Sequence, residues 1–453
     1  MSKLVKQTEL ELKEKIMDAL GRAVADGVLD EAPLPAFIIE VPKERQNGDY
    51  STNVAMAGAK AFHKAPRVIA QAIVDRLDLA DTVFDRAEIA GPGFINFFLG
   101  NRFYAAVLED LMAQGENYGR SDYGKGKRVL VEFVSANPTG PMHIGNARGG
   151  AIGDCLAAVL DWAGYDVQRV IDALKEKGVT YEQDGALWFK ASAFGNDKDI
   201  VLVRANGIPT YIVPDIAYHY NKLVTRGYDK AVDVLGADHH GYVPRMKAAL
   251  TALGLDADRL DCVIMQMVRL VRDGETIKLS KRSGKAITLN TLLEEVPIDA
   301  ARFFFNLREP NSHFDFDLEL AASTSNENPV YYVQYAHARI CSILRKAAEE
   351  GVTLRTPTTA ELEQLTAPEE RELIRHLAAL TDDVVTAAKT YDPAKITHYV
   401  IDLATLFHKF YNAQRVMVED EGLMQARLYL CTAVKNTIRN VLTMLKISVP
   451  ERM

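Results

Sequence analysis

The alternation of hydrophobic and polar positions divides the 453-residue chain into three regions. Residues 1–118 combine an amphipathic helix, with Leu12 and Ile16 on its apolar stripe, with short strands, and predict an α+β module. Residues 119–325 alternate strand and helix patterns, as in a parallel α/β sheet. Residues 326–453 carry four long helical patterns and no strand pattern, which predicts an all-α bundle.

Three shorter segments are predicted in more detail. We expect a turn that enters a helix at residues 48–53 and a strand at residues 210–213. We also expect a hairpin in which residues 263–271 and 275–279 flank an Asp-Gly turn.

The stretch at residues 129–153 has the pattern of a phosphate-binding turn. The β-branched run at 129–134 predicts a buried strand, a loop rich in Gly and Pro follows at 135–142, and a helix begins near His143. A helix start offers unpaired N–H groups and the positive end of its dipole to an anion. Gly145 lacks a Cβ and would leave room for a nucleotide.

A second candidate lies at residues 278–285, which read KLSKRSGK and contain four cations. Ammonium groups in such a loop would stabilise the charge that grows on a leaving pyrophosphate. The loop would close after ATP binds and open for product release.

Composition narrows the classes of protein. The chain is 48% hydrophobic and 25% charged with a net charge of −8, which is ordinary for a globular protein. Its four cysteines form no CxxC pair, and His239-His240 has no third ligand, so we expect no zinc and no disulfide framework. The N-terminal region has no apolar signal segment, and we expect a cytoplasmic protein without a membrane span.

Together the two candidate motifs carry a resemblance. HIGN at residues 143–146, followed 135 residues later by KLSKR, resembles the paired motifs of class I aminoacyl-tRNA synthetases. Further sequence motifs resemble those of the arginyl-tRNA synthetases, and the resemblance covers nearly the whole chain. These motifs are VEFVSANPTGP at 131–141, PTY at 209–211, DIAYH at 215–219, GADHHG at 236–241 and VPERM at 449–453.

The resemblance implies a domain for each region. Residues 119–325 would be a Rossmann-like nucleotide-binding catalytic domain, residues 1–118 a tRNA-contacting domain, and residues 326–453 an anticodon-binding domain. In the last of these, possible RNA-stacking or phosphate-binding residues are Tyr331, Tyr332, Tyr335, His337 and Arg339.

The resemblance also implies the amino-acid site. Carboxylates bind a planar guanidinium in a bidentate way that lysine cannot match. Glu132, Tyr211 and Asp215 would contact the guanidinium of L-arginine. Asn137 would hold the backbone of the arginine substrate, and His239 would lie at the rim of this amino-acid site.

The implied ATP site draws on both motifs. Its residues would be His143, Gly145, Asn146, Asp238, Lys278, Ser280 and Lys281. Those expected to be catalytic are His143, Asn146, Lys278 and Lys281. No metal ligand is expected from the protein, although Mg²⁺ would accompany ATP as its substrate ion.

The family's reaction then defines the partners. The arginine carboxylate attacks the α-phosphate of ATP to give arginyl-adenylate, and a terminal ribose hydroxyl of tRNA(Arg) takes the arginyl group. Members of the family usually need bound tRNA before they activate the amino acid. We expect the protein to act as a monomer.

The sequence departs from the family at one join. After GYDV at residues 164–167, family members continue into an Asn-Asp-Ala-Gly word and a longer insertion, whereas here Arg169 is followed directly by Val170. We therefore expect residues to be missing at this join. The basic loop also has Leu279 where Met is commonest, which is a tolerable apolar exchange.

Three other interpretations stay open at this point. A class I synthetase for cysteine or glutamine is one, but a cysteine enzyme would be expected to show zinc ligands. A small nucleotidylyltransferase would not explain the helical C-terminal region. A tRNA-binding regulatory paralogue with an inactive site is disfavoured by the intact His143, Lys278 and Lys281.

Overall fold

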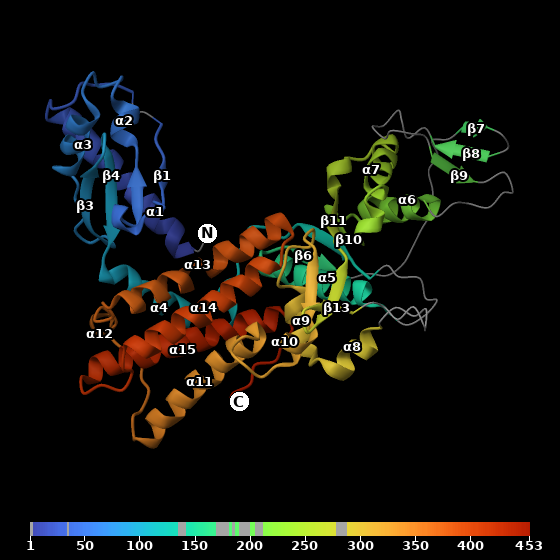
Figure 1. Ribbon diagram of the computed structural model, residues 1–453. Coiled ribbons are helices and arrows are strands. Elements are labelled where there is room, and N and C mark those ends of the chain that lie inside the picture. The colour runs from blue at the N-terminus through green and yellow to red at the C-terminus, as the bar shows by residue number, and fades with distance from the viewer. Residues whose placement is uncertain are drawn as a thin grey trace. The chain divides into compact units, whose positions relative to one another are not determined.

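The computed structural model describes residues 3–33, 36–134, 142–168, 181–183, 186–189, 200–203, 212–277 and 288–453 (Figure 1). The chain divides into two compact units, each built from three segments. The first unit contains Met1–Tyr118, Ser342–Leu380 and Thr405–Thr437. The second contains Gly119–Cys341, Thr381–Ala404 and Ile438–Met453.

Helices and strands keep one numbering along the chain. The α-helices are α1 (Lys3–Ala25), α2 (Val54–Gly58), α3 (Pro66–Val74), α4 (Asn101–Gln114), α5 (Ile144–Trp162), α6 (Ile212–Tyr220), α7 (Tyr242–Ala252), α8 (Leu289–Glu295), α9 (Ile298–Phe305), α10 (Leu318–Ala322), α11 (Pro329–Glu349), α12 (Thr359–Leu362), α13 (Pro368–Thr390), α14 (Ala394–Ala413) and α15 (Glu421–Met444). The strands are β1 (Ile39–Glu40), β2 (Tyr50–Thr52), β3 (Phe84–Ala90), β4 (Phe94–Leu99), β5 (Arg128–Glu132), β6 (Asp166–Gln168), β7 (Tyr181–Gln183), β8 (Ala186–Phe189), β9 (Ile200–Val203), β10 (Lys230–Gly236), β11 (Leu260–Met265), β12 (Val268–Arg272), β13 (Glu275–Thr276) and β14 (Phe314–Asp317).

In the first unit, an antiparallel sheet of order β1-β2-β4-β3 carries α2 and α3 (Figure 1). The turn expected at residues 48–53 is wrong for Tyr50–Thr52, which forms the inner strand β2. All three of its side chains are buried, and Tyr50 pairs with Phe97 of β4. Pairing on both edges outweighs the local turn preference of this polar segment.

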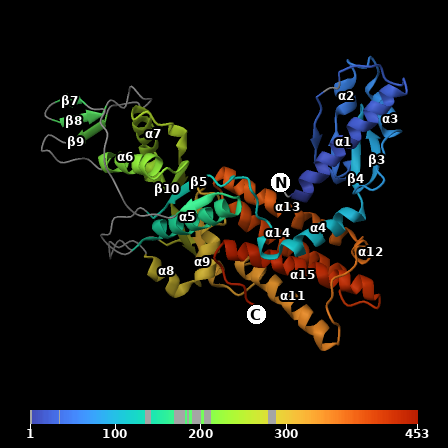
Figure 2. The same cartoon turned by 180° about the vertical axis from the view of Figure 1, so that it is seen from behind.

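The second unit is built on a parallel sheet of order β11-β10-β5-β6, which confirms the predicted parallel α/β class. Helix α5 packs on β5, β6 and β10 (Figure 2). Because β6 lies on one side of β5 and β10 on the other, the strand order reverses between β5 and β10. Ligands of open α/β sheets bind outside the carboxyl ends of the strands at such a switch point.

Two sequence predictions for this unit need correction. Residues 263–271 were expected as one strand of a hairpin, but β11 joins the parallel sheet and β12 pairs with β13 and β14. The apolar run is divided at Gln266, whose N–H donates to the Pro310 carbonyl instead of to a strand. The Asp273-Gly274 turn itself is confirmed, with positive φ at both residues.

The strand expected at residues 210–213 is wrong for Ile212 and Val213, which begin α6. Residues 210 and 211 lie outside the described residues.

The four long helical patterns of the C-terminal region are confirmed as α11, α13, α14 and α15. Their apolar stripes are buried, as Leu377 of α13 and Leu430 of α15 illustrate. His337 of α11 is also buried, and its Nδ1 lies 2.9 Å from the Pro450 carbonyl oxygen, so this candidate RNA contact is wrong. Among the described residues, no helix is both long and apolar enough to cross a membrane.

Candidate active site

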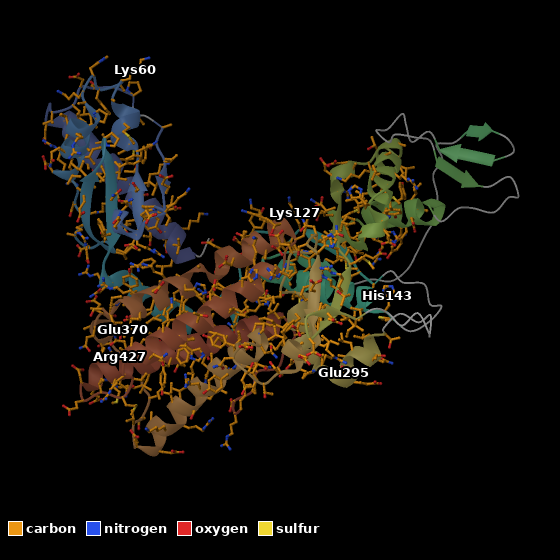
Figure 3. The ribbon with its side chains drawn as sticks, in the orientation of Figure 1. Lys60, Lys127, His143, Glu295, Glu370 and Arg427 are labelled. Atoms are coloured by element: carbon orange, nitrogen blue, oxygen red, sulfur yellow. The ribbon has the colours of Figure 1, made fainter. Side chains whose placement is uncertain are left out.

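His143 caps the N-terminus of α5, where Figure 3 labels it. Its Nδ1 accepts a hydrogen bond from the Asn146 N–H at 3.3 Å, and the Asn146 Oδ1 accepts one from the His143 N–H at 3.4 Å. This reciprocal pair is a capping box, which satisfies two N–H groups of the helix start. A neutral imidazole whose Nδ1 accepts has its proton on Nε2, so the exposed His143 side chain offers an N–H donor to an anion.

Two glycines allow close approaches around this cap. A Cβ on Gly145 would lie 3.0 Å from the Cε1 of His143, so the imidazole would have to shift by a few tenths of an ångström to admit that carbon. A Cβ on Gly153 would lie 2.2 Å from the Cγ of Phe133, which follows β5. Gly145 therefore leaves space for the His143 imidazole, and Gly153 lets α5 approach the carboxyl end of β5.

The start of α5 pairs with the first described residues after the basic segment. His143 and Thr288 form an isolated antiparallel β-bridge, and the Leu289 N–H donates to the Met142 carbonyl at 2.9 Å. At the near end, the Ile277 N–H donates to the Leu270 carbonyl of β12 at 2.9 Å. Lys278, Ser280 and Lys281 themselves lie outside the described residues, and the described chain resumes at Thr288, which pairs with His143.

Carboxylates gather at the switch point. Glu132 ends β5, and Asp233 is its partner in the parallel register of β10. The Lys222 Nζ lies 2.6 Å from the Glu132 Oε2 and 2.9 Å from the Asp233 Oδ1. Lys222 belongs to a short π-helix, Asn221–Thr225, that continues α6, and its side chain is fully buried.

The charges of this group follow from their pairing. Burial alone would lower the pKa of Lys222, but Asp233 and Glu132 raise it above the ordinary value, so the lysine is a cation. Burial opposes ionisation of Asp233, but His219 and Lys222 outweigh it and lower its pKa to about 2.

Asp215 joins the same group through the helix that carries it. The His219 Nε2 lies 2.6 Å from the Asp233 Oδ2, and its Nδ1 lies 2.8 Å from the Asp215 carbonyl oxygen. Burial raises the pKa of the Asp215 carboxyl, while His219 and a hydrogen bond with Tyr242 oppose that effect. Glu132 and Asp233 also raise this pKa, so the arrangement favours a cationic ligand near Asp215.

Asp238 and His239 follow the carboxyl end of β10 in a short 3₁₀ turn, Ala237–His239. The His239 Nε2 lies 3.6 Å from the Asp238 Oδ2, and both side chains are exposed. Two further predicted residues, Asn137 and Tyr211, lie outside the described residues.

Sequence reasoning missed Lys222, Asp233, His219 and Tyr242. One signal was available, because Asp215, His219 and Lys222 are spaced by four and three and therefore share one face of a helix. Asp233 within an apolar strand was a second signal, since a buried carboxylate requires a partner.

A buried cation holds the segments around the cap. Arg148 of α5 is fully buried, and burial lowers its pKa to about 10. Its Nη1 donates to the Gln266 carbonyl at 2.7 Å, and its Nη2 to the Glu309 carbonyl at 3.2 Å. Arg148 thereby ties α5 to the segment between β11 and β12 and to the segment before β14.

Three family models of aminoacyl-tRNA synthetase domains match the chain. Residues 107–171 and 168–315 match the family model of the class I (R) tRNA synthetase catalytic domain. Residues 10–99 match the arginyl-tRNA synthetase N-terminal domain, and residues 333–453 match the DALR anticodon binding domain. The chain belongs to the arginyl-tRNA synthetase family.

Curated relatives and solved structures agree with this family. The chain is 43% identical to the arginine–tRNA ligase of Caldanaerobacter subterraneus and 42% identical to that of Acetivibrio thermocellus, with both sequences covered completely in each case. The arginyl-tRNA synthetase structure of Thermus thermophilus shares the fold, with a TM-score of 0.70, 22% identity and coverage of 96% of this chain and 99% of that one. The structure from Plasmodium falciparum has a TM-score of 0.68, 16% identity and coverage of 98% and 99%.

The same comparisons bear on the join at Arg169. The alignment with the Caldanaerobacter relative runs over 562 residues, 109 more than this chain contains, so parts of the relative stand opposite gaps. The two matches of the catalytic model overlap at residues 168–171, which is where the sequence departs from the family pattern.

Proposed function

We propose that this chain is an arginine–tRNA ligase that activates L-arginine with ATP to arginyl-adenylate. It then transfers the arginyl group to the 3′ end of tRNA(Arg) and releases AMP and pyrophosphate. The observation that carries the proposal is the bridge between His143 and Thr288, because it joins a helix start at the switch point of a parallel sheet to the residue that follows the basic segment in the sequence.

The amino-acid pocket is assigned to the carboxylate side of this crevice. Glu132 and Asp215 accept hydrogen bonds from the guanidinium, and Tyr211 completes that contact. Asn137 holds the amino-acid backbone, and His239 lies at the rim. A neutral side chain would offer Glu132 and Asp215 no positive charge and no guanidinium N–H groups, and would therefore bind less well.

The ATP site is assigned to the helix-start side. The Nε2–H of His143 donates to a phosphate oxygen, with Gly145 and Asn146 holding the cap, and Asp238 binds the ribose. Lys278, Ser280 and Lys281 hold the pyrophosphate as it leaves. Neither step needs a protein nucleophile, so positioning and charge stabilisation supply the rate acceleration.

Mg²⁺ enters as the ion of the ATP substrate. Among the described residues, no group of three or more His, Cys, Asp or Glu side chains is arranged to hold a metal. We assign the ligands of Mg²⁺ mainly to the ATP phosphates and to water, because this ion usually keeps several waters and binds few protein ligands.

The flanking regions are assigned to tRNA. Residues 1–118 contact the body of tRNA(Arg), and residues 326–453 bind its anticodon. Both contacts weaken as the salt concentration rises. The protein acts in the cytoplasm as a monomer, and light scattering on a size-exclusion column that gave twice the mass of one chain would contradict that state.

Arginine-dependent ATP–pyrophosphate exchange, with and without tRNA(Arg), tests the proposal. We expect exchange with arginine and tRNA together, and none when lysine replaces arginine. His143→Ala is the control for contaminating synthetase, because it removes the phosphate donor. Absence of exchange in the presence of tRNA(Arg) contradicts the proposed function.

A further inference from the structure

We propose that Lys222 is a positioning residue that holds Glu132 in the orientation needed to bind the substrate guanidinium. The inference rests on the proposed function, because it takes Glu132 as part of the arginine pocket. Lys222 itself is fully buried and is assigned no contact with arginine.

The need for such a residue comes from the sheet. Glu132 and Asp233 are direct partners in the parallel ladder of β5 and β10, and both interact with one side chain, so they lie on the same face. Like charges at directly opposed positions repel each other. Without a cation between them, Glu132 would turn away from Asp233 or one carboxyl would bind a proton.

Lys222 supplies that cation at a fixed place. Its Nζ contacts the Glu132 Oε2 at 2.6 Å and the Asp233 Oδ1 at 2.9 Å, and it lies 4.4 Å from the Tyr218 ring centroid. The His219 Nε2 lies 3.4 Å from the same Nζ, and these four neighbours leave the fully buried ammonium little freedom. With one oxygen held by Lys222, the Glu132 carboxylate turns less freely, so Lys222 orients it for a guanidinium.

Lys222 is also linked to Asp215, the second carboxylate of the proposed pocket, through Asp233 and His219. Asp233 also contacts the His219 Nε2 at 2.6 Å, and the His219 Nδ1 contacts the backbone carbonyl of Asp215. Lys222, His219 and Asp215 are spaced by three and four positions, so they lie on the same face of α6 and its π-helical continuation. The network therefore fixes the helix that carries Asp215 against the strand that carries Glu132.

Kinetics of ATP–pyrophosphate exchange in the presence of tRNA(Arg) test this role. The variants are Lys222→Met, which keeps the length without the charge, Glu132→Gln, Asp233→Asn and the double variant Lys222→Met/Asp233→Asn. For Lys222→Met we expect the arginine KM to rise roughly tenfold or more, the scale of one charged hydrogen bond, while the ATP KM stays unchanged. The double variant should recover part of the arginine KM, because removal of Asp233 also removes the repulsion.

Each outcome decides between distinct possibilities. A wild-type arginine KM in Lys222→Met, or equal rises in the arginine and ATP KM values, overturns the positioning role. A double variant no better than Lys222→Met overturns it as well. If Lys222→Met does not fold, Asp233→Asn decides: Lys222 still holds Glu132 there, so an arginine KM as high as that of Glu132→Gln contradicts the inference.

Glu132→Gln separates this inference from the proposed function. An unchanged arginine KM in that variant removes Glu132 from the pocket and overturns both the site assignment and the role of Lys222. A raised arginine KM in Glu132→Gln with a normal value in Lys222→Met overturns the role of Lys222 alone.

Discussion

Thr288 pairs with His143 in a β-bridge although the two residues lie 145 positions apart in the sequence. Thr288 also caps the N-terminus of α8, where its Oγ1 accepts a hydrogen bond from the Thr291 N–H at 3.2 Å. The residue that follows the basic segment in the sequence is therefore fixed twice, once to the start of α5 and once to the first turn of α8. Changes at this anchor should affect the loop without touching the arginine pocket.

Thr288→Ala should lower the kcat of exchange severalfold and leave the arginine KM unchanged. The substitution removes the cap of α8, which is worth roughly 1 kcal/mol, and loosens the anchor that follows the segment proposed to hold the pyrophosphate. Steady-state exchange kinetics measure both constants. Thr288→Ser keeps the hydroxyl acceptor and is the matched control; if it loses as much kcat as Thr288→Ala, the cap is not the cause.

His143→Asn and His143→Ala should separate the cap from the phosphate contact. Asparagine is a good N-cap residue, so His143→Asn should keep the thermal stability of the wild type, whereas His143→Ala should lose roughly 1 kcal/mol of unfolding free energy. Both remove the Nε2 donor and should lower kcat roughly 10²- to 10³-fold. Thermal unfolding and exchange kinetics on the same samples make the comparison, and near-normal kcat in His143→Asn would remove the imidazole from the chemistry.

Asp215→Asn should weaken arginine binding while leaving the protein as stable as before or more stable. Burial raises the pKa of Asp215, so at neutral pH its ionised form is less favourable in the folded chain than in the unfolded one. That cost appears as the pH rises from the unfolded pKa to the higher folded value and persists above it. Asparagine cannot ionise, so the substitution removes this free-energy cost. It also removes one proposed charged contact with arginine, so we expect an arginine KM roughly ten- to a hundredfold higher at neutral pH.

The pH profile gives a second measurement for Asp215. If arginine binds the ionised carboxylate as proposed, the wild-type arginine KM should rise as the pH falls through the raised pKa of Asp215. The variant should lack this dependence. Glu132→Gln is the comparison, since it keeps Asp215 and should keep the profile; a profile unchanged by Asp215→Asn assigns the titration to another group.

Local pattern predicted the strand before His143 and the helix that begins beside it, because each is set by residues close in sequence, whereas the loop expected at 135–142 lies almost wholly outside the described residues. The four C-terminal helices were predicted for the same reason. The partnership of Glu132 with Asp233 was not predictable, because it depends on the register between strands that lie 101 positions apart. The spacing of Asp215, His219 and Lys222 defined a helix face, but only the sheet shows what that face contacts.

Arg148→Lys should destabilise the fold around the cap. The guanidinium donates from two nitrogens to the carbonyls of Gln266 and Glu309, and a third carbonyl, that of Ser312, lies 3.4 Å from Nη1. A lysine ammonium has no planar fork to reach both directions, so buried carbonyls would lose their donors. We expect the free energy of unfolding to fall by roughly 2–3 kcal/mol, the scale of a buried polar group left unsatisfied.

Arg269→Lys is the matched control for Arg148→Lys. Arg269 also makes a bidentate contact, with Asp315 at 2.6 and 2.9 Å, but both side chains are exposed. Water replaces a lost contact there, so the change should stay within about 0.5 kcal/mol. Chemical denaturation of both variants measures the difference. Equal losses would mean that the arginine fork matters in general; a loss confined to Arg148 would locate the effect in the buried carbonyls that join α5 to the strands on either side of the basic loop.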